Sequence, residues 1–195
     1  MASRGRPALP RGVFSFEAAD CPTPELVTLD SSFAVNALLS GETHHQAARD
    51  YLERLADQDC FLVYSHLLEL ELREVAFRAP LIEKFPKDWR RRRHDGRSLR
   101  RARRLIASTM AAWDELLTAF GHATVQVDAV FDGVPELMDR YGLASYDAVH
   151  AATAEMYGAS HLVTTDAGFA ALPASRLIMY VNAGRVTTCR SRRAR

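Results

Sequence analysis

Short β-rich runs that end at an aspartate and are followed by a helix signal constrain the fold of this chain more than any other feature. The first run is ELVTLD over residues 25–30, after which Ser31 and Ser32 can cap a helix. A later run, HLVTT over residues 161–165, leads directly into Asp166. Strands that alternate with helices along a chain are typical of a parallel sheet. The pattern therefore predicts the α/β class, as a three-layer α/β/α sandwich with a mainly parallel central sheet.

The remaining strands are expected over residues 60–64, 124–127 and 177–181, where β-rich runs recur between helical patterns. The carboxyl ends of parallel strands share one edge of a sheet, and ligands bind α/β folds at that edge. Asp30 and Asp166 are both strand-end acids, so we expect them to lie at this edge. Asp128 also follows a predicted strand, but no helix-start acid pairs with it, and turn chemistry accounts for it.

A third aspartate is expected at the start of a helix in the segment YGLASYDAVHAATAEMYG, residues 141–158. Ser145 is predicted to cap this helix, which places Asp147 in the first turn, and Gly158 closes it. Each acid also has a purely structural explanation. An acid in a first turn interacts favourably with the helix dipole, by about 0.3–1 kcal/mol, and an aspartate after a strand can cap a turn. Only convergence of several acids on one place indicates a function.

A glutamate of the helix SHLLELELREVAFR, which opens at Ser65, is expected to join the aspartates. Glu69 and Glu71 lie about 200° apart on a helix, so at most one of them can face a given site. Carboxylates packed together repel one another unless a proton or a cation neutralises them. Ligand sets made of oxygen alone favour Mg²⁺ or Mn²⁺, and Mg²⁺ suits in-line attack on a phosphodiester. The acids therefore indicate a metal-dependent nuclease.

Basic residues are concentrated in one segment, although the net charge of the chain is only +1. Residues 80–104 contain eleven lysines and arginines against three acids. This segment is either a solvated, partly disordered insertion before a helix or a surface that attracts the phosphates of a polyanion without reading its sequence. The candidate RNA-binding residues are Arg90, Arg91, Arg92, Arg93, Arg97, Arg100 and Arg101.

The ends of the chain and its cysteines set further bounds. Residues 1–24 hold half of the eight prolines and are predicted to be a flexible arm, residues 25–182 to form the domain, and residues 183–195 to form a solvated basic tail. Three cysteines, widely separated, indicate neither a disulfide framework nor a zinc site and fit a reducing compartment. No window approaches the ~18 apolar residues of a membrane span, and the N-terminus lacks the apolar core of a secretion signal. We therefore expect a cytoplasmic protein with no membrane partner.

Three segments, in this order, resemble the motifs of the PIN domain, and especially of the VapC ribonuclease toxins of bacterial toxin–antitoxin pairs. They are LDSSFAVNALL (residues 29–39), YSHLLELELREV (residues 64–75) and YGLASYDAVHAATAEMYGASHLVTTDAGF (residues 141–169). The resemblance covers residues 26–182 apart from the basic insertion. The arm, the insertion and the basic tail depart from the family's pattern and leave the acids untouched.

The resemblance assigns roles to particular residues. By motif, Asp30, Asp147 and Asp166 match three of the family's four acids. The family's spacing selects Glu71 as the fourth acid and leaves Glu69 as the alternative. Two hydroxyl residues match minor site positions, Ser32 beside the first acid and Thr164 at the start of the Thr-x-Asp pattern. His150 stands where related sequences vary, and packing against the site is expected of it rather than catalysis.

The resemblance also implies an activity and partners. It implies endonucleolytic cleavage of RNA that depends on Mg²⁺ or Mn²⁺, a homodimer, and inhibition by a cognate antitoxin whose segment occupies the active-site groove. Two alternatives stay open. One is a housekeeping PIN nuclease without an antitoxin, and the other is a catalytically silent RNA-binding protein of the same fold.

Overall fold

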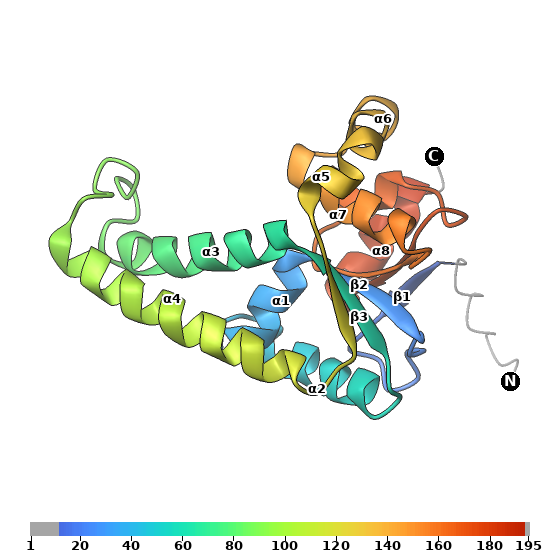
Figure 1. The fold of residues 1–195 in the computed structure, drawn as a ribbon, viewed down its shortest axis with the longest axis horizontal. Helices are drawn as coiled ribbons and strands as arrows, with labels where there is room; N and C mark the ends of the chain where they lie inside the picture. The colour runs from blue at the N-terminus through green and yellow to red at the C-terminus, as the bar shows by residue number, and fades with distance from the viewer. Residues whose placement is uncertain (1–11, 194–195) are drawn as a thin grey trace, which may run out of the picture.

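The computed structural model describes residues 12–193 and is built around one central sheet (Figure 1). The strands are all parallel and lie in the order β1-β6-β5-β2-β3-β4. Their bounds are β1 Val13–Ser15, β2 Leu26–Leu29, β3 Phe61–Ser65, β4 His122–Val125, β5 His161–Val163 and β6 Ile178–Val181. The parallel sheet predicted from the alternating pattern is confirmed.

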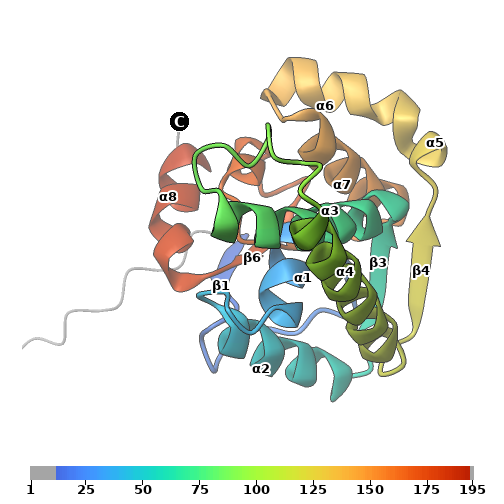
Figure 2. The same cartoon turned by 90° about the vertical axis from the view of Figure 1, so that its left-hand side faces the viewer.

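Helices cover both faces of the sheet. The larger helices are α1 Ser31–Leu38, α2 His45–Ala56, α3 His66–Lys84, α4 Gly96–Leu117, α6 Val134–Tyr141, α7 Ser145–Met156 and α8 Ala183–Arg193. Shorter turns of helix are α5 Val127–Val130, η1 Phe131–Gly133 and η2 Gly168–Ala171. Figure 2 shows α1 and α2 on one side of the sheet and α6 and α7 on the other. The three-layer α/β/α architecture is confirmed.

Two hydrophobic cores lie between the layers, one on each face of the sheet, because successive side chains of a strand point to opposite faces. On β3, Leu62 and Tyr64 point into the core formed with α1–α4, whereas Val63 points into the core formed with α5–α8. On β6, Tyr180 joins the first core and Met179 the second. The sheet is therefore buried on both faces, as all-parallel sheets are.

Residues 80–104 form the end of one helix, a turn and the beginning of the next. Helix α3 continues through the buried Pro80 to Lys84, and α4 begins at Gly96. Asp95 caps α4, because its Oδ2 accepts a hydrogen bond of 2.9 Å from the backbone N–H of Ser98. Nζ of Lys84 lies 3.0 Å from the same oxygen and closes the turn. The basic segment is thus part of a helical hairpin, not an insertion before a helix.

Both ends of the described chain belong to the fold, which corrects two predictions. The flexible arm predicted for residues 1–24 is wrong from Gly12 onward, because β1 pairs with β6 at the edge of the sheet; residues 1–11 lie outside the described part. The predicted basic tail is helix α8 up to residue 193, with Cys189 fully buried. Arg193 donates hydrogen bonds of 2.8 Å to the carbonyl of Gly12 and 2.6 Å to that of Leu177. Helix α8 therefore fastens β1 to the domain.

A few local predictions differ from the structure by one or two residues. Ser145 is the first residue of α7 rather than its cap, and Ala144 takes the cap position without a side-chain hydrogen bond. Asp128 lies in the first turn of α5, one element beyond the strand end where it was predicted, and its Oδ1 accepts a hydrogen bond of 3.1 Å from the N–H of Ala129. Across residues 12–193, no helix is both long enough and apolar enough to cross a membrane.

Candidate active site

Asp30 and Asp166 lie at the carboxyl ends of adjacent strands, β2 and β5. Asp30 is the N-cap of α1, and its backbone N–H donates a hydrogen bond of 3.0 Å to the carbonyl of Val163 on β5. Asp166 follows β5 by three residues and is exposed. The parallel sheet therefore places both acids at one edge, as predicted from the sequence.

Asp147 lies beside Asp166. A Cβ atom built onto Gly168 would lie 3.4 Å from Oδ2 of Asp147 and 3.3 Å from Oδ1 of Asp166, so the two carboxylates flank this glycine. The backbone N–H of Gly168 donates a hydrogen bond of 2.7 Å to the same oxygen of Asp166. The bare backbone at this position leaves space between the two acids.

Hydroxyl groups fix the carboxylate of Asp30, which is 4% exposed. Its Oδ2 accepts hydrogen bonds from the hydroxyl of Ser32 and, at 2.7 Å, from the hydroxyl of Thr164. The oxygen of Thr164 also accepts the N–H of Asp166 at 2.9 Å, and the oxygen of Ser32 accepts the N–H of Thr165 at 2.9 Å. One oxygen of Asp30 is thus held by both chain segments, while Oδ1 makes no hydrogen bond to another described residue.

Glu71 reaches the site from α3 through His150. The Nε2 atom of this buried histidine lies 2.8 Å from Oε2 of Glu71 and 3.6 Å from Oδ1 of Asp30. Glu69, the alternative fourth acid, lies near Tyr64 instead: burial is the main cause that raises the pKa of the Tyr64 phenol, and the charge of Glu69 adds to it. The structure therefore brings Glu71, and not Glu69, to the aspartates.

The acids perturb one another, which shows that they share one electrostatic environment. Burial is the largest cause that raises the pKa of Asp147 to about 6, and the charges of Asp30, Asp166 and Glu71 raise it further while His150 lowers it. Burial alone would lower the pKa of His150, but the hydrogen bond to Glu71 and the charges of Asp30, Glu71 and Asp147 raise it. Four acids and one imidazole, from four separate elements, thus face each other.

The donor set fits a hard divalent cation by its chemistry. All four acids offer oxygen, and their mutual repulsion makes a cation favourable. As the side chains stand, residues 12–193 contain no group of three or more His, Cys, Asp or Glu close enough to hold a metal ion. Mg²⁺ takes only one or two carboxylates and keeps several waters, so a closed cage of protein ligands is not required. The available donors are Oδ1 of Asp30, which accepts no hydrogen bond from another described residue, the carboxylate of Glu71 and the two acids beside Gly168.

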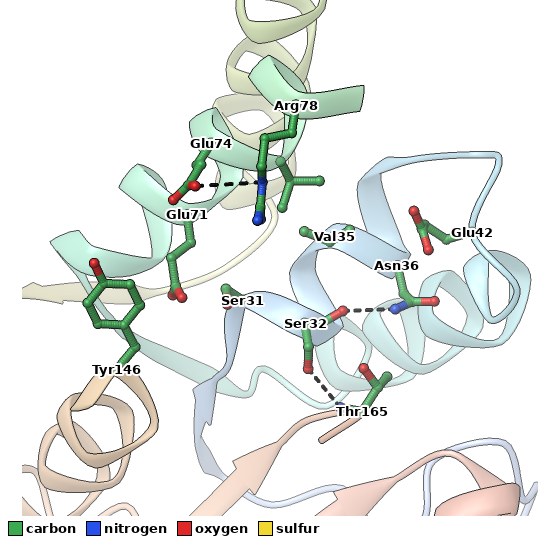
Figure 3. A pocket seen from close by; sticks show the side chains of 11 residues that line it. Ser31, Ser32, Val35, Asn36, Glu42, Glu71, Glu74, Arg78, Tyr146 and Thr165 are labelled. Carbon is green, nitrogen blue, oxygen red and sulfur yellow. Dashed lines mark hydrogen bonds and ion pairs between the residues drawn. The ribbon is translucent and has the colours of Figure 1, made fainter. Parts of the chain in front are cut away.

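A groove of about 630 Å³ adjoins the acids between α1, α3 and the start of α7 (Figure 3). Glu71 points into it, with Tyr146 at one end and Arg78 farther along α3. Ser31, Ser32 and Thr165 line the side next to Asp30. The candidate RNA-binding arginines do not line this groove. The site thus combines an acidic centre with an open channel beside it.

A family model of the PIN domain matches residues 27–174, about three quarters of the chain. The chain belongs to the PIN domain family. PIN domains are generally nucleases and typically use divalent metal ions. No curated protein matches the chain. The family expected from the motifs is confirmed, while the VapC subgroup stays a prediction.

His150 packs against the site of this PIN domain, as expected from the sequence, but its contacts with Glu71 and Asp30 were not predicted. His150 is three residues after Asp147 on α7, and residues at this spacing share a helix face. The spacing therefore contained a signal that His150 faces the site. Its partner Glu71 is 79 positions away, and no local pattern connects the two.

Proposed function

We propose that this PIN domain is an endoribonuclease that hydrolyses RNA phosphodiester bonds with Mg²⁺ or Mn²⁺. The observation that carries the proposal is the convergence of four acids from separate elements: Asp147 and Asp166 flank Gly168, and His150 lies 2.8 Å from Glu71 and 3.6 Å from Asp30. Such a group of carboxylates is unfavourable unless a cation joins it, and acids with a divalent cation suit phosphodiester hydrolysis.

Each acid has a defined part in the proposed reaction. Asp30, Glu71, Asp147 and Asp166 would hold the cation, which supplies Lewis-acid stabilisation of the negative charge that develops on the phosphate. Ser32 and Thr164 keep Oδ2 of Asp30 occupied, so that its Oδ1 stays directed to the site. His150 orients Glu71 by its hydrogen bond to Oε2.

The adjoining groove would receive the RNA strand. Tyr146 is half exposed at one end of the groove, where a base can stack on its ring, and Glu71 lies between it and Arg78. RNA rather than DNA is supported by the resemblance of the three ordered motifs to VapC ribonuclease toxins. The same resemblance supports a toxin role, a cognate antitoxin segment in the groove, and a homodimer.

The test is cleavage of an end-labelled single-stranded RNA by the full chain, with Mn²⁺, with Mg²⁺ and with EDTA. Internal cuts that need the cation and disappear in Asp147→Asn are expected. A DNA strand of the same sequence, run in parallel, tests the choice of RNA. Binding without cleavage under every condition would overturn the proposal and favour the silent RNA-binding alternative.

The toxin role needs a separate experiment. Expression of the wild-type chain should arrest bacterial growth, whereas Asp147→Asn should not, and the product of a neighbouring small gene should restore growth. Cleavage without growth arrest would favour the housekeeping nuclease. Light scattering of the purified chain tests the homodimer.

A further inference from the structure

Helices α3 and α4 form an arm that leaves the body of the domain. Figure 1 shows them running side by side, away from the sheet, to the turn that joins them. The arm is defined here as residues 77–104, which comprise the end of α3, the turn and the start of α4. Glu71 lies on the same helix, 13 residues before Lys84, which is about 20 Å along the axis. One continuous helix therefore connects the candidate active site to the tip of the arm.

The arm carries a dense positive charge that its own acids do not neutralise. Lys84 is paired with Asp95 at 3.0 Å, and Arg101 with Glu83 at 2.7 Å. The other arginines of the arm beyond Arg78 form no ion pair within residues 12–193, and all of them are exposed: Arg90, Arg91, Arg92, Arg93, Arg97, Arg100, Arg103 and Arg104. Such a density of free guanidinium groups attracts a polyanion.

Aromatic rings lie among these charges. The guanidinium of Arg90 lies 5.0 Å from the ring centre of Trp89, that of Arg92 lies 5.6 Å from the ring of Phe85, and that of Arg93 lies 6.0 Å from the ring of Phe77. The rings are half-buried, so they hold the guanidinium groups without hiding them. Surfaces that combine arginines with accessible aromatic rings are typical of sites for single-stranded nucleic acid.

The composition of the arm argues against other large partners. A membrane surface requires apolar side chains that enter the lipid. Between Glu71 and Leu117, the only large apolar side chain that the described structure exposes is Ile82. An acidic protein would satisfy the charge, but it would not explain the half-buried rings of Trp89 and Phe85 among the arginines. RNA accounts for both features.

We propose that the arm is a second RNA-binding site, whose tip grips the phosphates of a single strand about 20 Å from Glu71 along α3. The inference rests on the proposed endoribonuclease function, because the same strand then reaches the candidate active site. A stacked strand advances about 3.4 Å per nucleotide, so about six nucleotides separate the arm from the cleavage point. RNAs shorter than this distance can occupy only one of the two sites.

The first test measures binding apart from cleavage. Full-length Asp147→Asn protein is titrated with a fluorescent 20-nucleotide RNA in EDTA at several salt concentrations. The comparison adds Arg91→Gln, Arg97→Gln and Arg100→Gln together to the same background. The binding constant K falls as salt rises, and each lost phosphate contact should make the plot of log K against log salt less steep by about 0.7. The three substitutions together should therefore make it less steep by about 2 and weaken binding about tenfold or more. The matched control is Arg49→Gln, an exposed arginine on α2, which should change neither.

The second test uses RNA length. The three arm substitutions should weaken binding of the 20-nucleotide RNA by a larger factor than that of a 4-nucleotide RNA, because only the long RNA can bridge the two sites and lose that bridging. An unchanged salt slope with the long RNA overturns the arm as an RNA-binding site, even if the protein cleaves RNA. A lowered slope in a protein that never cleaves RNA supports the arm and overturns only the endoribonuclease function. Weakened binding of an acidic protein, with RNA binding intact, would assign the arm to that partner instead.

Discussion

The Nε2 atom of His150 lies 2.8 Å from Oε2 of Glu71 and 3.6 Å from Oδ1 of Asp30, so one buried imidazole ring faces two acids of the candidate site. The ring belongs to α7, Glu71 to α3 and Asp30 to the cap of α1. His150 thus links the three helices that surround the acids. We infer that it positions Glu71 and does not itself react.

Replacement of His150 tests this positioning role. His150→Ala leaves Glu71 without its hydrogen bond, which should lower the stability by about 1–3 kcal/mol and weaken Mn²⁺ binding. His150→Gln keeps a donor and should restore part of the Mn²⁺ affinity. Calorimetric Mn²⁺ titration and thermal unfolding measure both effects. The matched control is His161→Gln, which removes a contact of 2.9 Å with the hydroxyl of Tyr180 and should leave Mn²⁺ affinity unchanged. Equal Mn²⁺ affinity in all three variants would refute the role.

Asp147→Asn should make the metal-free protein more stable at pH 7.5 while it abolishes cleavage. The pKa of Asp147 is raised from 3.8 to about 6 in the folded state, so between these values the folded protein keeps a proton that the unfolded chain releases. Folding stability contributed by this group therefore falls as pH rises through this window and stays low above it. The variant should gain about 1–2 kcal/mol at pH 7.5, after discounting for partial exposure, and nothing near pH 4.

Urea unfolding of both proteins in EDTA, at pH 4 and at pH 7.5, measures this difference. Mn²⁺ should also stabilise the wild type more at pH 7.5 than at pH 5, because the proton competes with the cation at Asp147. A variant that is less stable than wild type at pH 7.5 in EDTA would show that the ionised Asp147 is not under strain from its neighbours.

Thr164→Val should weaken the site by freeing Asp30. The hydroxyl of Thr164 donates to Oδ2 of Asp30 at 2.7 Å and accepts the N–H of Asp166 at 2.9 Å, and valine keeps the shape but makes neither bond. The loss of these two hydrogen bonds, one of them to the buried carboxylate of Asp30, costs about 1–3 kcal/mol. The melting temperature and the rate of RNA cleavage should both fall. Thr164→Ser keeps the hydroxyl and should retain most of the cleavage; if it loses as much as valine does, the hydroxyl is not the cause.

Gly168→Ala should weaken cation binding with little effect on stability. The added methyl group would lie 3.3 Å from Oδ1 of Asp166 and 3.4 Å from Oδ2 of Asp147, close enough to push the carboxylates by a few tenths of an ångström. Mn²⁺ affinity, measured by calorimetry, should fall several-fold. Gly41→Ala is the control, because nothing lies within 4 Å of its added methyl group. Identical Mn²⁺ affinity in the two variants would mean that the space beside Gly168 is not used.

The sequence predicted the part of the site that local patterns encode. Asp30 and Asp166 follow β-rich runs directly, and the carboxyl ends of parallel strands share one edge of a sheet, so their proximity was predictable from the sequence. Asp147 followed from the helix signal around Ser145. Helix periodicity shows that Glu69 and Glu71 cannot both face one site, but it does not say which of them does. The choice of Glu71 came from the resemblance.

Contacts between distant segments were not predictable in this way. Strand β1 has only three residues in a proline-rich region, and its place in the fold depends on pairing with β6, which lies about 165 positions later. Helix α8 has a single fully buried residue, Cys189, so its sequence shows no apolar stripe. The continuation of α3 through Pro80 to Lys84 was not predicted either, because residues 80–104 were interpreted as an insertion or a charged surface.

Helix α3 runs without a break from His66 to Lys84, so the direction in which the arm points is fixed relative to Glu71. Successive residues of a helix are rotated by about 100° around its axis. An insertion or deletion of one residue between Glu71 and Lys84 would therefore swing the basic tip to another side of the domain, although it would alter no charge and no acid. The length of α3, as well as the charge of the tip, therefore sets where the basic side chains lie relative to Glu71.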